Sequence, residues 1–297
     1  MLLKFLLILS LGVQINAFGF QEPLSTLLQK HASEISRLRE ETQSFASIDT
    51  AQAPYDNDVF YLRYCLAEKG SDDLKKTLEW RQGAGKDVCE AALAAFEKAK
   101  ADSAWNNEPV REGAPYADSI NQFITPSTCL TTSSSQSDLL YIVRAGLIDG
   151  GALTGSLNSV DNLVDFFLYC KEINALVAND RSLKLDKLLY VIVVNDLKGV
   201  QLIGGDSSFR DALGAASKIG NPLYPELNGP TLLLNLPRLV SALVKLFTPL
   251  FPPEVQARIK FERGPLEKVE DLLDVNYGGK DRSKFLADID MLCYTKS

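Results

Sequence analysis

Histidine is almost missing from this chain of 297 residues, which contains only His31. Ser-His-Asp and Cys-His catalytic groups need an imidazole as the base, yet no histidine follows position 31 and no GxSxG motif is present. Metal sites built on several histidines are excluded for the same reason. The sequence therefore predicts a protein that is not an enzyme and that has neither a metal nor a catalytic cofactor.

A basic excess and a regular cysteine framework are missing as well. The net charge of −7 argues against a nucleic-acid partner, because such proteins usually carry an excess of Lys and Arg. The cysteine count is odd, the spacings are wide and no CxxC occurs, for Cys65, Cys89, Cys129, Cys170 and Cys293. Secreted domains stabilised by disulfides usually show even, dense cysteines, so free thiols in a reducing compartment are the better interpretation.

The N-terminal apolar run is too short to span a membrane, which takes about 20 apolar residues. Lys4, an apolar stretch over 5–13 and Ala17 predict a signal peptide over 1–17, cut between Ala17 and Phe18. An N-terminal core or amphipathic helix is the alternative. Phe18 at the cut resembles the bipartite presequences of secondary plastids, so residues 18–54 are interpreted as a transit segment and linker with a helix over 24–42. Delivery to a plastid is expected, with secretion or an endomembrane lumen as the alternative.

Apolar periodicity divides the rest of the chain into two parts. Residues 55–128 predict a small helical unit, with helices near 56–66, 71–82 and 87–102. In residues 129–297, strands alternate with helices: strands at 139–143, 188–194, 231–235 and 259–262, helices at 160–178, 209–219 and 239–247. Such alternation predicts an α/β fold with a mostly parallel sheet, and the uninterrupted apolar run 188–194 predicts a sheet covered on both faces.

Five motifs carry a family resemblance in their order and spacing. They are Asp196-Leu197-Lys198-Gly199, Tyr224-Pro225-Glu226, Asn235-Leu236-Pro237, residues 245–251 with Pro249, and Tyr277-Gly278-Gly279. Together with residues 61–83, they resemble the CRAL-TRIO lipid-binding family with its N-terminal helical extension. The resemblance implies the CRAL-TRIO fold, in which the sheet floors a hydrophobic pocket that a mobile helix closes.

The resemblance also implies which residues line that pocket. The gate would be the helix from 239 to 251, which is apolar on nearly all sides, whereas a surface helix keeps a polar face. Val191 and Val193 are two apart on one strand and are expected to face the ligand together, with the other face of the strand against packed helices. The predicted pocket residues are Val191, Val193, Leu232, Leu234, Leu239, Leu243, Phe247 and Phe251.

Head-group recognition follows from the same resemblance. Lys69, Glu226 and Arg258 match the positions that hold an inositol phosphate in phosphoinositide-binding members, with Glu68 where a second base is usual. The alternative is that Lys69 and Arg258 are solvated surface charges. Val191 and Val193 stand where phosphatidylcholine-binding members have hydroxyl groups, so phosphatidylcholine is expected to be disfavoured. Asp196 and Lys198 are expected to brace the turn after the strand.

The predicted function is non-enzymatic binding and intermembrane transfer or presentation of a hydrophobic ligand, such as a phospholipid, a phosphoinositide or an isoprenoid. The alternative is a lipid-sensing regulatory or scaffold module that binds lipid without transferring it. The expected partners are that ligand and a membrane surface contacted peripherally by a monomer, with no nucleic acid.

Overall fold

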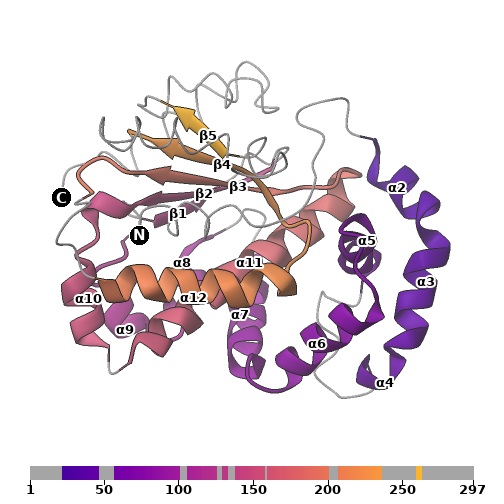
Figure 1. Ribbon diagram of the computed structural model, residues 1–297, viewed down its shortest axis with the longest axis horizontal. Coiled ribbons are helices and arrows are strands. Elements are labelled where there is room, and N and C mark those ends of the chain that lie inside the picture. The colour runs from indigo at the N-terminus through magenta and orange to yellow at the C-terminus, as the bar shows by residue number, and fades with distance from the viewer. Residues whose placement is uncertain are drawn as a thin grey trace.

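A mostly parallel sheet forms the centre of the protein (Figure 1). The computed structural model describes residues 22–46, 57–100, 106–125, 129–132, 138–157, 159–200, 207–235 and 259–262. The strands are β1 (Cys129–Thr132), β2 (Leu139–Arg144), β3 (Val191–Asp196), β4 (Asn228–Leu234) and β5 (Ile259–Glu262). They lie side by side in chain order, with β1 antiparallel to β2 and the others parallel. This confirms the predicted α/β class.

Sequence patterns located most strands to within a few residues. The expected strand at 259–262 coincides with β5, and the one at 188–194 begins three residues before β3 begins and ends two residues before β3 ends. β1 was not predicted, because its Cys-Leu-Thr-Thr sequence is short and runs into a serine-rich segment that resembles a loop. It pairs antiparallel with the next strand, β2.

Three helices cover one face of the sheet: α10 (Gly150–Ser156), α11 (Val160–Leu185) and α12 (Ser207–Leu223) (Figure 1). The long helix α11 begins at Ser159, whose hydroxyl accepts a hydrogen bond from the Asp161 backbone N–H, as N-cap serines do. It ends at Asp186, which takes the left-handed conformation with a φ of 50°. A 3₁₀ turn, η1 (Ala145–Leu147), follows β2.

The opposite face of the sheet is buried as well. Leu140, Ile142, Ile192, Val194 and Leu232 alternate with the residues that face α11 and α12, and all are buried. Strands buried on both faces are apolar without alternation, which explains the uninterrupted run at 188–194. The prediction of a sheet covered on both faces is confirmed.

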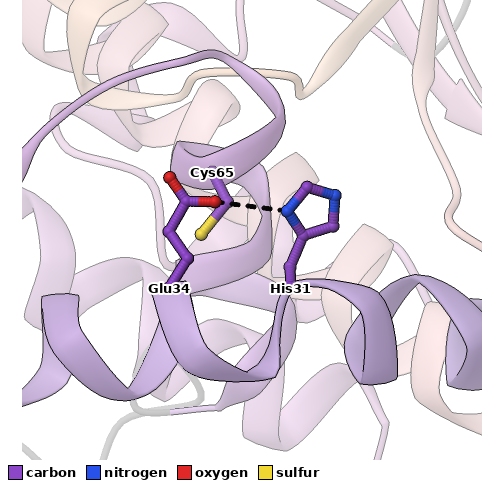
Figure 2. A group of neighbouring side chains, drawn as sticks. All are labelled: His31, Glu34 and Cys65. Atoms are coloured by element: carbon purple, nitrogen blue, oxygen red, sulfur yellow. Dashed lines mark hydrogen bonds and ion pairs between the residues drawn. The ribbon is translucent and has the colours of Figure 1, made fainter.

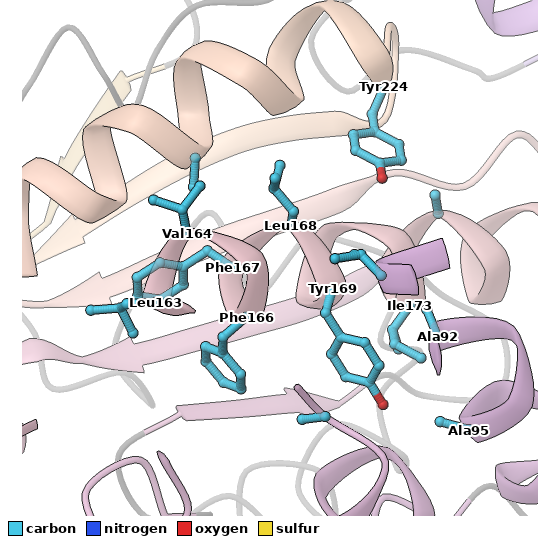
Figure 3. Packing of buried hydrophobic residues seen from close by; sticks show 14 of the residues in the cluster. Ala92, Ala95, Leu163, Val164, Phe166, Phe167, Leu168, Tyr169, Ile173 and Tyr224 are labelled. Carbon is cyan, nitrogen blue, oxygen red and sulfur yellow. The ribbon is translucent and has the colours of Figure 1, made fainter. Parts of the chain in front are cut away.

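The predicted helical unit consists of α5 (Asp58–Leu66), α6 (Ser71–Gln82) and α7 (Lys86–Ala99), followed by the short helices α8 (Glu108–Glu112) and α9 (Ala117–Ile120). Helix α7 packs directly on α11, because its alanines allow close approach: Ala92 and Ala95 lie in one cluster with Tyr169 and Ile173 (Figure 3). The unit therefore shares its core with the sheet domain.

Residues 22–46 are helical, in agreement with the predicted helix over 24–42, and they pack against the rest of the protein; their assignment to a transit segment and linker stays a prediction. They form α2 (Leu24–Lys30), α3 (Ala32–Glu41) and α4 (Gln43–Ala46), and Leu24, Ile35 and Leu38 are buried with residues of α5. Asp186 caps α2, accepting bonds from Leu24 N at its carbonyl (2.9 Å) and from Ser25 N at its carboxylate (2.7 Å). The signal-peptide prediction at Ala17 and Phe18 falls outside the described residues.

Candidate functional site

A cavity of about 570 Å³ lies between the sheet and the helices α11 and α12. Such a volume is typical of pockets that bind one small organic ligand, roughly 300–1,000 Å³. Its sheet side is formed by β2, β3 and β4, through Tyr141, Val143, Val191, Val193, Asn195 and Thr231. Its helix side includes Phe167 and Cys170 of α11 and Phe209, Leu213 and Ala216 of α12. The lining is therefore largely apolar.

Val191 and Val193 both line this cavity, on the same face of β3 as their spacing predicted. The cavity and the packed helices lie on one side of the sheet, which corrects the expectation that ligand and helices use opposite faces of the strand. A helix that connects two parallel strands packs on one face of their sheet, and α11 and α12 both pack on the face that carries the cavity. The cavity lies within that layer, beside the buried core of α11 and α12.

Leu232 and Leu234 do not line the cavity, although both are buried. The register explains their position: Val193 pairs with Thr231, and Val194 pairs with Leu232. Because side chains alternate along a strand, Thr231 faces the cavity and the two leucines face the other side. The remaining predicted pocket residues, Leu239, Leu243, Phe247 and Phe251, lie outside the described residues.

Polar groups gather at one part of the cavity wall. Lys171 and Asn174 come from α11, Asn195 from β3 and Asn221 from α12. Lys171 Nζ donates to Asn221 Oδ1 over 3.1 Å, and burial lowers the pKa of this lysine to about 8. The stem of Lys171 lies over Gly220, where a Cβ would come within 2.6 Å of the lysine Cδ. Glycine at this position therefore leaves room for the lysine side chain.

The Asp-Leu-Lys-Gly motif ends β3 in a braced turn, as predicted for Asp196. One carboxylate oxygen of Asp196 accepts from the Lys198 backbone N–H at 3.0 Å and from Asn235 Nδ2 at 2.8 Å. Gly199 has a φ of +82°, a conformation that glycine adopts without strain. The turn also passes close to η1, since a Cβ on Gly146 would lie 2.0 Å from the Lys198 carbonyl oxygen.

Arg63 is a buried connector that the sequence analysis missed. From α5, its Nε donates to Asn179 Oδ1 (2.8 Å) and its Nη2 to the Leu189 carbonyl (2.7 Å), and Nη1 donates to the Glu226 carbonyl. Burial lowers the pKa of Arg63 to about 10, with partial compensation from nearby Tyr190, Glu226 and Asp138. A single guanidinium thus connects α5, α11 and the segments preceding β3 and β4.

A second buried connection involves the Tyr-Pro-Glu motif. Arg81 of α6 forms a two-pronged ion pair with Glu172 of α11, at 3.1 and 2.9 Å. Tyr224 donates to the same carboxylate over 2.6 Å, and burial followed by the charge of Glu172 raises the pKa of Tyr224. Bidentate guanidinium–carboxylate pairs have well-defined geometry, so this contact fixes α6 against α11.

The predicted head-group residues are not brought together around the cavity. Glu226 is buried, with its carbonyl bound to Arg63, and neither it nor Lys69 lines the cavity. Lys69 is half-buried just after α5, and Arg258 lies outside the described residues. The head-group role of these three residues stays a prediction. The polar cavity residues Lys171, Asn174 and Asn195 were missed, although polar residues at helical spacing on a buried face were visible in the sequence.

His31, Glu34 and Cys65 form a side-chain cluster where α2, α3 and α5 meet (Figure 2). Their potential ligand atoms lie within 4.8 Å of one another, and His31 Nδ1 is 3.2 Å from Glu34 Oε2. Burial, and then the charge of Glu34, raise the pKa of the Cys65 thiol to about 12. The contact between His31 and Glu34 joins the end of α2 to α3, and Cys65 of α5 packs beside it. The cluster also shows that His31 packs against α5, while its assignment to a presequence stays a prediction.

Over the described part of the chain, every helix is too short or too polar to cross a bilayer. The sheet, its helical layer and the largely apolar cavity between them define an α/β ligand-binding domain with an appended helical unit. The CRAL/TRIO domain family matches residues 128–279, just over half of the chain, and the protein belongs to that family. Members of this family generally bind or transfer lipids.

The chain is also similar to the crystal structure of Sfh5. That likeness covers 89% of this chain and 90% of Sfh5, with a TM-score of 0.48 and 15% sequence identity. No curated protein sequence matches the chain.

Proposed function

We propose that this protein is a non-enzymatic carrier that takes one hydrophobic ligand into the cavity above the sheet and exchanges it with membranes. The observation that supports this function best is the cavity itself, with Val191 and Val193 on its floor. Moving a methylene group out of water into an apolar environment is favourable by about 0.8 kcal/mol, and a lipid already has this stabilisation in the bilayer. A carrier cavity must therefore match the bilayer with a continuous apolar wall.

Filling the cavity tests this function. In Val193→Trp, the indole would occupy the space in front of β3, so uptake of radiolabelled oleic acid, phosphatidylinositol or α-tocopherol from vesicles should fall. Leu183→Trp is the control, because Leu183 is exposed on α11 and does not line the cavity. Equal uptake by wild type and Val193→Trp, or no uptake of any of the three by wild type, would refute the proposed site.

The sensing alternative differs in kinetics. A carrier accelerates movement of the label from donor to acceptor vesicles, whereas a sensor binds the label and leaves its transfer rate unchanged. Preferential uptake of phosphatidylcholine would contradict the inference drawn from Val191 and Val193, since neither valine offers a hydroxyl group. Turnover of an ester lipid by the purified protein would contradict the non-enzymatic part of the proposal.

Plastid delivery is a further part of the proposal, supported by the sequence around Phe18 alone. A fluorescent fusion of the full chain should reach plastids, and the Phe18→Ala fusion should be mis-sorted. Unchanged sorting of the variant would favour the secretory alternative.

A further inference from the structure

The polar part of the cavity wall contains hydrogen-bonding groups without protein partners. Asn174 and Asn195 are only 4% and 8% exposed, and both line the cavity. Among the residues that the structure describes, Asn174 Oδ1 and Asn195 Nδ2 have no hydrogen-bond partner. Leaving a buried polar atom without a hydrogen bond is unfavourable, so such atoms in a cavity wall indicate that a bound molecule supplies the missing hydrogen bond.

Lys171 adds an uncompensated positive charge to the same wall. Its described hydrogen bond is to the neutral Asn221 amide, and no carboxylate within the described residues pairs with it. The pKa of Lys171 is lowered by desolvation alone, which agrees with the lack of a nearby negative charge. Asp149, which also lines the cavity, is exposed and caps α10 through the Ala152 N–H. A bound anion would neutralise the positive charge of Lys171.

Topology brings these groups to one level of the cavity. Helix α11 leads directly into β3 and runs back along it, with Ser182 Oγ accepting from Leu189 N at 2.9 Å. From that contact, Asn195 lies about 20 Å along the strand. Lys171 and Asn174 lie about 16 and 12 Å back along the helix. Lys171 therefore lies within about 4 Å, and Asn174 within about 8 Å, of the level of Asn195 along the cavity that all three line.

We infer that this wall binds the carboxylate of a single-chain lipid acid, with Lys171 as the counter-ion and the amides of Asn195 and Asn174 as further donors. This inference rests on the proposed function and specifies its ligand. A carboxylate presents two acceptor oxygens and one charge, which one ammonium and one or two amide N–H groups satisfy. Rotation of the Asn174 amide by half a turn presents its N–H group in place of its oxygen.

The size of the cavity supports one chain. If a methylene group takes about the volume of a water molecule in the liquid, about 30 Å³, then 570 Å³ holds about 19 such groups. That is close to the size of an acid with about 18 carbons. The apolar floor at Val191 and Val193 would contact the chain, and the polar wall would contact the acid group.

The test compares oleate with neutral and phosphate-bearing molecules that carry the same chain. The delipidated full-length protein is equilibrated at pH 7 with phosphatidylcholine vesicles containing radiolabelled oleate, methyl oleate, oleyl alcohol or oleoyl lysophosphatidate. Wild type should retain oleate about 10- to 100-fold better than methyl oleate, as expected for hydrogen bonds to a charged group. Lys171→Met should lose most of that preference while retaining methyl oleate at the wild-type level, which also shows that the variant folds.

The matched control is Lys184→Met, on the same helix. Lys184 is exposed and pairs with Asp180 over 2.7 Å, away from the cavity, so its substitution should leave oleate retention unchanged. Equal retention of oleate and methyl oleate by wild type would overturn the anion site while leaving the carrier function intact. Better retention of lysophosphatidate than of oleate would overturn the carboxylate assignment. An unchanged oleate preference in Lys171→Met would overturn the role of the lysine.

Discussion

Replacing Arg63 with Met should destabilise the protein by about 4 kcal/mol. Three hydrogen bonds from a charged donor, at about 1.5–3 kcal/mol each, stabilise the fold by roughly 5–9 kcal/mol. Burial of the guanidinium, which lowers its pKa to about 10, offsets about 3 kcal/mol of that. Methionine fills most of the space, but it leaves Asn179, Leu189 and Glu226 without the donor.

Urea unfolding followed by circular dichroism measures this loss, with Arg39→Met as the control. Arg39 forms an exposed pair with Asp58 at 2.9 Å, and such surface pairs contribute about 0–1 kcal/mol. Arg63→Lys keeps the positive charge but has no planar fork to reach three acceptors, so it should also lose most of the stability. If Arg63→Met unfolds within 1 kcal/mol of Arg39→Met, or if Arg63→Lys matches wild type, the reasoning about this connector is wrong.

Two further predictions concern the turn after β3 and the buried lysine. Gly146→Ala should lower the free energy of unfolding by about 1–3 kcal/mol, because the new Cβ meets the Lys198 carbonyl. Gly155 in α10 has open space around it, so Gly155→Ala should instead stabilise the protein by up to about 1 kcal/mol in the same urea assay. For Lys171, the folded pKa of about 8 lies below the unfolded value, so between these values the unfolded chain binds more protons and stability rises with pH. Lys171→Met should therefore be more stable than wild type by about 1–2 kcal/mol at pH 7, a value discounted for the partial exposure of the lysine. This difference should shrink toward pH 10, where the lysine loses its proton in the folded protein. A difference that does not change with pH would contradict the lowered pKa of Lys171.

The strands and long helices were predictable because burial imposes a pattern that the sequence carries. The apolar run 188–194 and the helical spacing of Leu163, Val164 and Phe167 both report packing against neighbouring layers. β1 was missed because its four residues are too few to show a strand pattern and run into a serine-rich segment. The packing of residues 22–46 on the rest of the protein was not foreseen, because a charged helix such as α3 needs only a narrow apolar stripe to dock, and Ile35 and Leu38 supply it.

The cavity was predictable in part, for a reason that concerns strand register. The family resemblance assigned Val191 and Val193 to the pocket and their spacing placed both on one face of the strand, and both line the cavity. Leu232 and Leu234 were assigned to the same face, but the pairing of Val193 with Thr231 turns them away. One residue of register decides which face a side chain occupies, and no local pattern in a strand that is apolar on both faces reveals it.

The ion pair between Arg81 and Glu172 has a consequence for how the protein is divided experimentally. The family match begins at residue 128, yet the cation that neutralises Glu172 comes from position 81. A fragment starting at 128 would expose one face of α11 and leave the buried Glu172 carboxylate without its cation, a loss of about 3–5 kcal/mol. Such a fragment should be insoluble or partly unfolded, so the boundary of the conserved domain is not a boundary of folding.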